Sequence, residues 1–244
     1  MIRKIIQSYQ VGQLLKKVEL SDMNTREFDS IHHINNLDKK VCKLNMPHMI
    51  KANEFIASLS AKEVQYANSC NSTNLVSSVN FKHFVDKTMV RDNAKYVFHN
   101  VAKDPNIAGV MDQLIPIPQF LPVKKMSQLR ICRLYAGGKY SGTNLHNHSA
   151  ALNYLVSGKK FWITFSFNKE THAFVESNSM KYGTVKDNTI QWLIKNLDLL
   201  NLNKEMLHLE CFMQEGGQVV YLPEGQYHAI INLDDSIGIT YSWN

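Results

Sequence analysis

Apolar residues in the first part of the chain recur at the three- and four-residue spacing of helices. Three stretches show this spacing, at residues 14–20, 55–59 and 81–85. A run rich in asparagine and serine at 68–74 predicts a loop between them. The pattern therefore predicts a helical N-terminal region that covers residues 1–95.

The pattern changes at Tyr96, where short runs of β-branched and aromatic residues begin, separated by glycines. A helical repeat at 189–202 interrupts them. We therefore expect residues 96–244 to form a β-sandwich or barrel with one inserted helix. The predicted strands are residues 96–98, 129–134, 152–156, 161–167, 218–222, 228–232 and 237–243.

Composition narrows the class of protein. The chain has 244 residues, of which 44% are hydrophobic and 20% charged, so a wholly disordered protein is excluded. No apolar run approaches the roughly 18 residues of a membrane span, and the N-terminus lacks the apolar core of a secretory signal. Four cysteines without a CxxC pair indicate neither a thiolate zinc site nor a disulfide framework. We therefore expect an intracellular protein, in the nucleus or cytoplasm, with no membrane partner.

The formal net charge is +6 at pH 7, and the isoelectric point is near 9.0. This balance permits nucleic acid as a partner. The basic residues are scattered in pairs rather than gathered in a tract, so charge supports a nucleic-acid partner only weakly.

Three histidines are spaced as metal ligands could be. His146 and His148 are two positions apart, so on a strand both side chains would point to the same face. His228 falls on a separate predicted strand. Such a set can form a facial triad that leaves metal positions open. From spacing alone, a metal site and a hydrogen-bonding role both stay possible. The remaining histidines lack partners at useful spacing and are interpreted as non-functional: His32, His33, His48, His83, His99, His172 and His208.

The residues around these histidines resemble a known family. The blocks 141–148, 153–162 and 214–240 resemble the JmjC domain, in particular its branch of arginine demethylases and lysyl hydroxylases. The resemblance extends over roughly residues 96–243. It implies a double-stranded β-helix, which is a cupin-like or jelly-roll-like barrel, with the helical N-terminal region packed on it. It further implies an oxygenase that uses Fe(II), 2-oxoglutarate and dioxygen to hydroxylate or demethylate a substrate.

The resemblance also assigns roles to single residues. It implies that His146, His148 and His228 hold the metal, and that Lys160 pairs with the far carboxylate of 2-oxoglutarate. Lys159 is the alternative to Lys160 if the strand bulges at the preceding glycine. Further members of the cosubstrate pocket by this resemblance are Thr143, Asn153, Asn232, Thr240 and Tyr96. For Asn232 and Thr240 the capping of strand ends is the alternative role.

The sequence departs from the family at one position. The second metal ligand of the family is an acid in an HxD or HxE pair, whereas this chain has His148. A neutral imidazole adds one unit of charge to the site and removes an anion that helps to hold Fe(II). Two hypotheses therefore stand. The first is a 2-oxoglutarate-dependent dioxygenase acting on a protein side chain, with lysyl hydroxylation ahead of demethylation of methylated arginine or lysine. The second is a catalytically inactive JmjC binding module.

The oligomeric state is expected to be a monomer, or a dimer formed through the helical N-terminal region. This expectation rests on the last predicted core strand ending at the C-terminus of the sequence, which leaves out the helices that follow it in many relatives of the family.

Overall fold

The computed structural model describes residues 2–21, 23, 25–27, 40–45, 50–67, 77–91, 95–115, 117, 121, 123–180 and 188–242. The loop predicted at 68–74 and the final residue of the last predicted strand lie outside these ranges. Among the described helices, none is long and apolar enough to cross a membrane.

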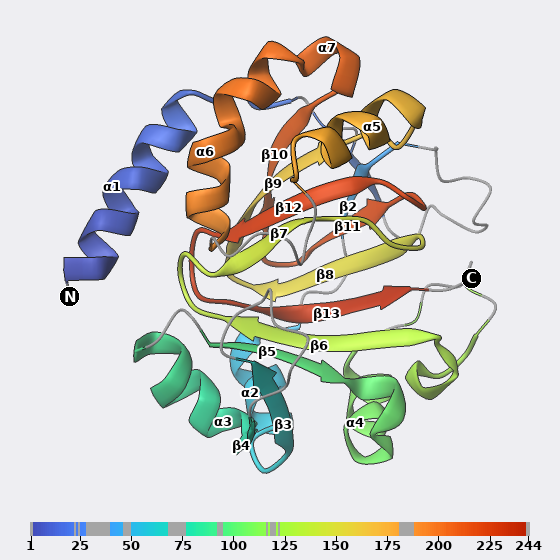
Figure 1. Ribbon diagram of the computed structural model, residues 1–244. Coiled ribbons are helices and arrows are strands. Elements are labelled where there is room, and N and C mark those ends of the chain that lie inside the picture. Colours follow the sequence, from blue (N-terminus) through green and yellow to red (C-terminus); the bar gives the residue numbers. More distant parts are fainter. Residues whose placement is uncertain are drawn as a thin grey trace.

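Two antiparallel sheets face each other and form the centre of the molecule (Figure 1). Eight consecutive strands, β6 to β13, are divided equally between the two sheets. Four of them run β11-β8-β13-β6 in the large sheet, and the other four run β10-β9-β12-β7 in the small sheet. This winding is a double-stranded β-helix, so the predicted fold class is confirmed. The strands are β6 (Ile131–Gly137), β7 (Gly142–His146), β8 (Ala151–Ser157), β9 (Lys159–Phe165), β10 (Glu210–Glu215), β11 (Gln218–Leu222), β12 (Tyr227–Asn232) and β13 (Ser236–Ser242).

A single glycine carries the chain from one sheet to the other between β8 and β9. Gly158 has a φ of 103°, which side-chain-bearing residues rarely adopt. A Cβ at this position would lie 2.5 Å from the backbone oxygen of Asp235. The turn therefore requires glycine, and it places Lys159 and Lys160 at the start of the small sheet.

The N-terminal region contains the predicted helices but also strands that the apolar pattern did not indicate. These strands extend the large sheet at both edges, since β2 pairs with β11 and β3 pairs with β5, the strand predicted at residues 96–98. They were missed because they are short, and because Ser77–Asn80 is largely polar. The first helix ends at Lys16, so the helical spacing predicted for residues 17–20 is wrong. The elements are α1 (Ile2–Lys16), β1 (Thr25–Glu27), β2 (Cys42–Asn45), α2 (Ala52–Ser58), β3 (Glu63–Ala67), β4 (Ser77–Asn80), α3 (Phe81–His83), a π-helical turn (Phe84–Met89) and β5 (Tyr96–Asn100).

Helices cover the outer faces of both sheets (Figure 1). The inserted helix α6 (Thr189–Leu202) matches its prediction, begins at the Asn188 cap, and packs with α1 against the small sheet. A second apolar cluster lies under the large sheet, where α2 and α4 cover it. The space between the two sheets is thus left to the residues that face inward. The remaining helices are α4 (Pro105–Leu114), α5 (Lys169–Ser177) and α7 (Lys204–Leu207), with 3-10 turns at Val101–Lys103 and Met126–Gln128.

Candidate metal centre and adjoining pocket

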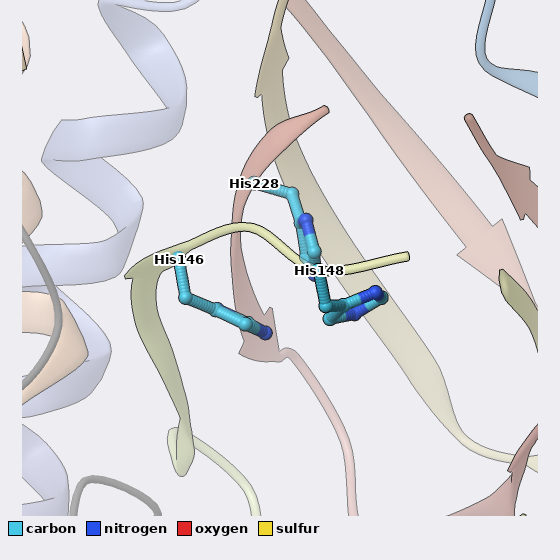
Figure 2. A group of neighbouring side chains, drawn as sticks. All are labelled: His146, His148 and His228. Carbon is cyan, nitrogen blue, oxygen red and sulfur yellow. The ribbon is translucent and has the colours of Figure 1, made fainter. Parts of the chain in front are cut away.

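The three histidines meet at one end of the barrel (Figure 2). His146 is the last residue of β7 and lies opposite His228 of β12. His148 is not on the strand, as the sequence had suggested, but in the connection that leads to β8. Their potential ligand atoms all lie within 4.8 Å of one another. The structure therefore brings together all three predicted ligands, although the chain turns between two of them.

A bulge in β7 sets which side chains of that strand face the barrel interior. His228 lies opposite His146, but Ile230 lies opposite Thr143, so three steps on β7 match two steps on β12. Strict alternation would place Thr143 and His146 on opposite faces. The extra residue brings both onto the same inner face.

Backbone carbonyls orient the three imidazoles. The Nδ1 atom of His146 lies 2.8 Å from the carbonyl oxygen of Asn144, and that of His148 lies 2.7 Å from the carbonyl of Ser149. In His228 the corresponding distance, to Gln226, is 3.0 Å. A carbonyl only accepts, so each Nδ1 carries the proton and each Nε2 keeps its lone pair. This is the arrangement that fixes histidine ligands around a metal.

Burial keeps the three histidines neutral. It lowers the pKa of His146 to about 4, with the neighbouring His148 adding to the effect. It also lowers the pKa of His148 and holds that of His228 well below its usual value. Neutral imidazole is the form that binds a metal. Within the described residues no aspartate or glutamate joins the cluster, so three neutral nitrogens form the donor set.

The second feature of the barrel interior is a buried cation. Lys160 is 1% exposed and lies opposite Asn232, between the two sheets. Its Nζ lies 3.6 Å from the centroid of the Tyr135 ring, and in the ranges of the chain that the structure describes it has no carboxylate partner. Burial holds the pKa of this amine well below its usual value. Lys159, by contrast, points outward to Glu215 at 2.8 Å. The inward-facing lysine is therefore Lys160.

Polar side chains from the large sheet surround this lysine. The Tyr135 hydroxyl donates to Asn153 Oδ1 at 2.9 Å, and Asn153 Nδ2 donates to Thr240 Oγ1 at 2.7 Å. The Asn153–Thr240 pair links two neighbouring strands, because the two residues lie opposite each other on β8 and β13. Tyr135 was missed in the sequence, where it stands in an apolar run. Its alternation with Arg133 and Gly137 along the strand is the signal that could have indicated an inward side chain.

The remaining predicted pocket residues include Asn232, which lies opposite Lys160 on β12, and Tyr96 of β5. Asn232 Nδ2 donates to Ser141 Oγ at 2.8 Å, while its Oδ1 is buried without a hydrogen-bond partner among the described residues. Tyr96 packs on Gly137, where a Cβ would lie 2.4 Å from the tyrosine ring. The structure thus places all six predicted cosubstrate residues on the inner faces of the barrel, together with Tyr135 and Ser141.

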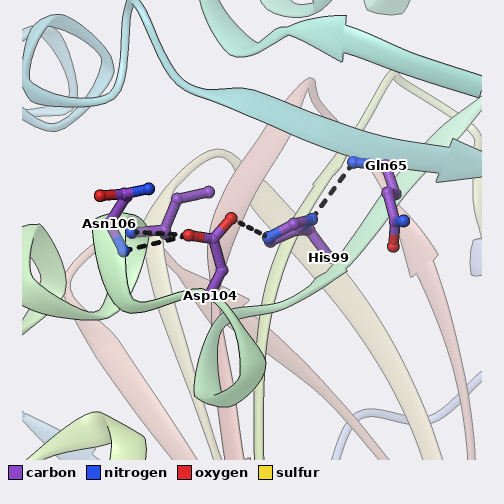
Figure 3. Close-up of polar contacts among 5 residues, drawn as sticks. Gln65, His99, Asp104 and Asn106 are labelled. Atoms are coloured by element: carbon purple, nitrogen blue, oxygen red, sulfur yellow. Dashed lines mark hydrogen bonds and ion pairs between the residues drawn. The ribbon is translucent and has the colours of Figure 1, made fainter.

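Two of the histidines interpreted as non-functional, His99 and His172, have side-chain hydrogen-bond partners among the described residues. Figure 3 shows that His99 Nδ1 accepts from the Gln65 backbone N–H at 3.3 Å. Its Nε2 lies 3.2 Å from Asp104, whose other carboxylate oxygen caps α4. His172 Nδ1 lies 2.9 Å from the Tyr227 hydroxyl. His32, His33 and His48 lie outside the described residues.

Fold and site together define a double-stranded β-helix protein with a three-histidine candidate metal centre. Residues 133–243 match the family described as JmjC domain, hydroxylase. The chain is therefore similar to that family over this region, which is less than half of its length.

Three curated relatives match part of the chain. It is 30% identical to the arginine-specific demethylase JMJ20 of Arabidopsis thaliana, over 45% of this chain and 23% of that protein. It is 27% identical to the arginine-specific demethylase JMJ22 of the same plant, over 42% of this chain and 21% of the relative. It is 30% identical to the JmjC domain-containing protein 8 of Mus musculus, over 42% of this chain and 34% of the relative. The match thus spans about a fifth to a third of the length of each relative.

Proposed function

We propose that the protein is an Fe(II)- and 2-oxoglutarate-dependent oxygenase that acts on a protein side chain. The observation that carries the proposal is the pairing of two features inside one barrel. Three neutral Nε2 atoms converge at one end. A buried lysine without an anion among the described residues, Lys160, lies deeper between the sheets. A metal on the three nitrogens would suit the keto-acid end of 2-oxoglutarate, and the lysine would suit its other carboxylate.

The residues present fit the metal and the cosubstrate by their chemistry. Imidazole nitrogen is a good ligand for Fe(II), and the three Nδ1–H groups are held by carbonyls as a stable metal site requires. An anion beside Lys160 would remove the cost of a buried charge without a partner. The amide of Asn232, whose oxygen has no described partner, adds a further polar group. When bound, iron with 2-oxoglutarate and dioxygen supplies the oxidation of a C–H bond, with succinate and carbon dioxide as the co-products.

In this proposal, residues of the chain bind and orient the metal and the cosubstrate. His146, His148 and His228 would hold the iron, and Lys160 would hold the far carboxylate of the cosubstrate. Asn153 and Thr240 would fix one side of that pocket through their mutual hydrogen bond. By resemblance to the demethylase and hydroxylase branch, we propose lysyl hydroxylation as the first activity to test. Demethylation of methylated arginine or lysine comes second, because two of the relatives are named as arginine-specific demethylases.

Anaerobic titration of the purified protein with Fe(II), followed by calorimetry, tests the metal centre. We expect one ion per chain, and binding at least about tenfold weaker after His146→Ala or His228→Ala. His172→Ala is the matched control, because this exposed histidine belongs to α5 and contacts Tyr227 rather than the triad. Equal iron binding in His146→Ala and in the control would show that the triad does not hold the metal.

A second candidate function is a non-catalytic JmjC binding module, which the histidine at position 148 favours. The cluster lacks a carboxylate among the described residues, so it carries one more positive charge than the centre of the family. The discriminating variant is His148→Asp, assayed for turnover of 2-oxoglutarate. A decrease would show that the three-histidine centre is the working one. Turnover that arises only in the variant would instead favour the binding module.

A further inference from the structure

Arg133 of β6 lies on the inner face of the large sheet. Its neighbours across the strands are Asn100 of β5 and Thr240 of β13. Directly opposed residues in a sheet share a face, and Thr240 is the partner of Asn153 in the cosubstrate pocket. Asn100, Arg133 and Thr240 therefore form a polar row across three strands on the side that faces the small sheet.

This row lies near the metal end of the barrel. Two positions further along β13 is Ser242, which lies opposite Ala151. Ala151 is the first residue of β8 and follows His148 by three positions. Lys160, by contrast, lies near the start of β9, just after the other end of β8. These two cations of the barrel interior are thus at different levels, because Arg133 lies two positions closer to the metal end of β6 than Tyr135, whose ring Lys160 contacts.

Three buried polar atoms of this row and of Ser242 have no hydrogen-bond partner among the described residues. Arg133 Nε is buried and makes no hydrogen bond within the described chain, and the same holds for Asn100 Oδ1 and Ser242 Oγ. Ser242 is only 3% exposed, so its hydroxyl is a buried group with an unused donor. Unsatisfied buried polar groups are costly and are retained where they have a task.

The charge of Arg133 is also uncompensated. Its guanidinium lies over the ring of Phe98, 5.0 Å from the ring centroid, and Phe98 is 43% exposed. Burial lowers the pKa of Arg133, and no carboxylate among the described residues acts against this effect. A half-buried guanidinium without an acidic partner, at the rim of the barrel, is suited to an anion from outside the chain.

We infer that Arg133, with Asn100 and Ser242, recognises a carboxylate of the substrate, at a site distinct from that of Lys160. The inference rests on the proposed function. The planar fork of a guanidinium matches the two oxygens of a carboxylate, and the exposed ring of Phe98 offers an apolar surface to the chain that carries it. Lys160 is enclosed and suits a small cosubstrate. Arg133 is partly open and suits one group of a larger molecule, such as an acidic residue near the modified side chain.

Fluorescence anisotropy with a labelled (Glu-Gly)₃ peptide and metal-free protein tests the site. We expect the native chain to bind this peptide and Arg133→Gln to bind it at least tenfold more weakly. Arg130→Gln is the matched control, because it removes the same charge from an exposed arginine three positions away, and its affinity should change less than twofold. Arg133→Lys keeps the positive charge but loses the planar guanidinium. Its affinity for the peptide should therefore lie between those of the native chain and Arg133→Gln, and this variant tests the site even if Arg133→Gln folds poorly. Equal loss in both glutamine variants, or no binding of the peptide by the native chain, would overturn the inference.

Competition with free N-acetylglutamate identifies the source of the carboxylate. If N-acetylglutamate displaces the labelled peptide only at a far higher concentration than the unlabelled peptide does, an acidic peptide is supported as the ligand. If the two compounds displace it at similar concentrations, the assignment to a larger substrate is overturned. A (Gln-Gly)₃ peptide should not bind in either case. Because iron and 2-oxoglutarate are absent from these measurements, their outcome is independent of whether the protein turns over its cosubstrate.

Discussion

Replacement of Lys160 by methionine should stabilise the free protein and abolish its response to 2-oxoglutarate. The side chain is 1% exposed and contacts the Tyr135 ring without an anionic partner among the described residues. Exchange of a buried ion pair for apolar groups of similar volume is often neutral or stabilises a protein by about 1–4 kcal/mol, and a buried cation without a partner carries the same kind of desolvation cost with no ion pair to offset it. For a chain of this size each kcal/mol changes the melting temperature by about 2–4 °C. We therefore expect Lys160→Met to melt several degrees higher than the native chain when no cosubstrate is present.

The stability advantage of the variant should shrink or reverse when cosubstrate is added. At 2-oxoglutarate about 100 times above its Kd, binding adds about 2.7 kcal/mol to the native chain and little to the variant. Differential scanning calorimetry with Mn(II), with and without 2-oxoglutarate, measures both effects. Lys159→Met is the control, since it removes only the exposed pair with Glu215, which contributes about 0–1 kcal/mol. A variant that is less stable than the native chain without ligand, or that keeps the full ligand-induced shift, would refute the reasoning.

Three further outcomes follow from the structure. Gly158→Ala should lower the free energy of unfolding by about 1–3 kcal/mol, because the position has a positive φ and an added Cβ would be crowded. Gly12→Ala, where an added Cβ would have no neighbour within 4 Å, should not lower it. Urea denaturation of the two variants and the native chain measures the difference. Burial lowers the pKa of His99 below its unfolded value despite the nearby Asp104. The neutral ring therefore stabilises the fold above about pH 6.5, and this contribution is lost as the pH falls. His99→Gln should flatten the decline of the free energy of unfolding between about pH 7.5 and 5.5, and an unchanged decline would contradict this. Tyr135→Phe removes a donor to Asn153, and should cost about 1–2 kcal/mol of stability and weaken 2-oxoglutarate binding in calorimetry; unchanged values of both would contradict the pocket.

Much of the barrel could be predicted because its strands carry strong local signals. The run at 218–222 coincides with β11, and the helix at 189–202 coincides with α6. Strand β10 was missed, although it holds Phe212 against the inner face of the barrel. Short edge strands such as β4 are stabilised by pairing with a neighbour that is distant in the sequence, and no local pattern encodes that partner.

The candidate site could also be predicted only in part. The resemblance assigned His146, Lys160 and Asn153 to one site, and the structure places these residues on the inner faces of one barrel, while their roles stay predictions. It could not show that the strand ends at His146, or that a bulge between Thr143 and His146 brings both residues to the inner face. Nor could it indicate Arg133, whose importance lies in the absence of a described partner, a property of packing and not of spacing.

The most direct measurement of the central claim is succinate release from 2-oxoglutarate by the purified protein with Fe(II) and ascorbate. A metal-chelated sample and His146→Ala serve as controls. The proposed function predicts succinate that forms only with iron, is lost in both controls, and increases when an acidic lysine-containing protein substrate is present. Absence of iron-dependent succinate from the native chain, with the metal bound and the protein folded, would contradict the oxygenase.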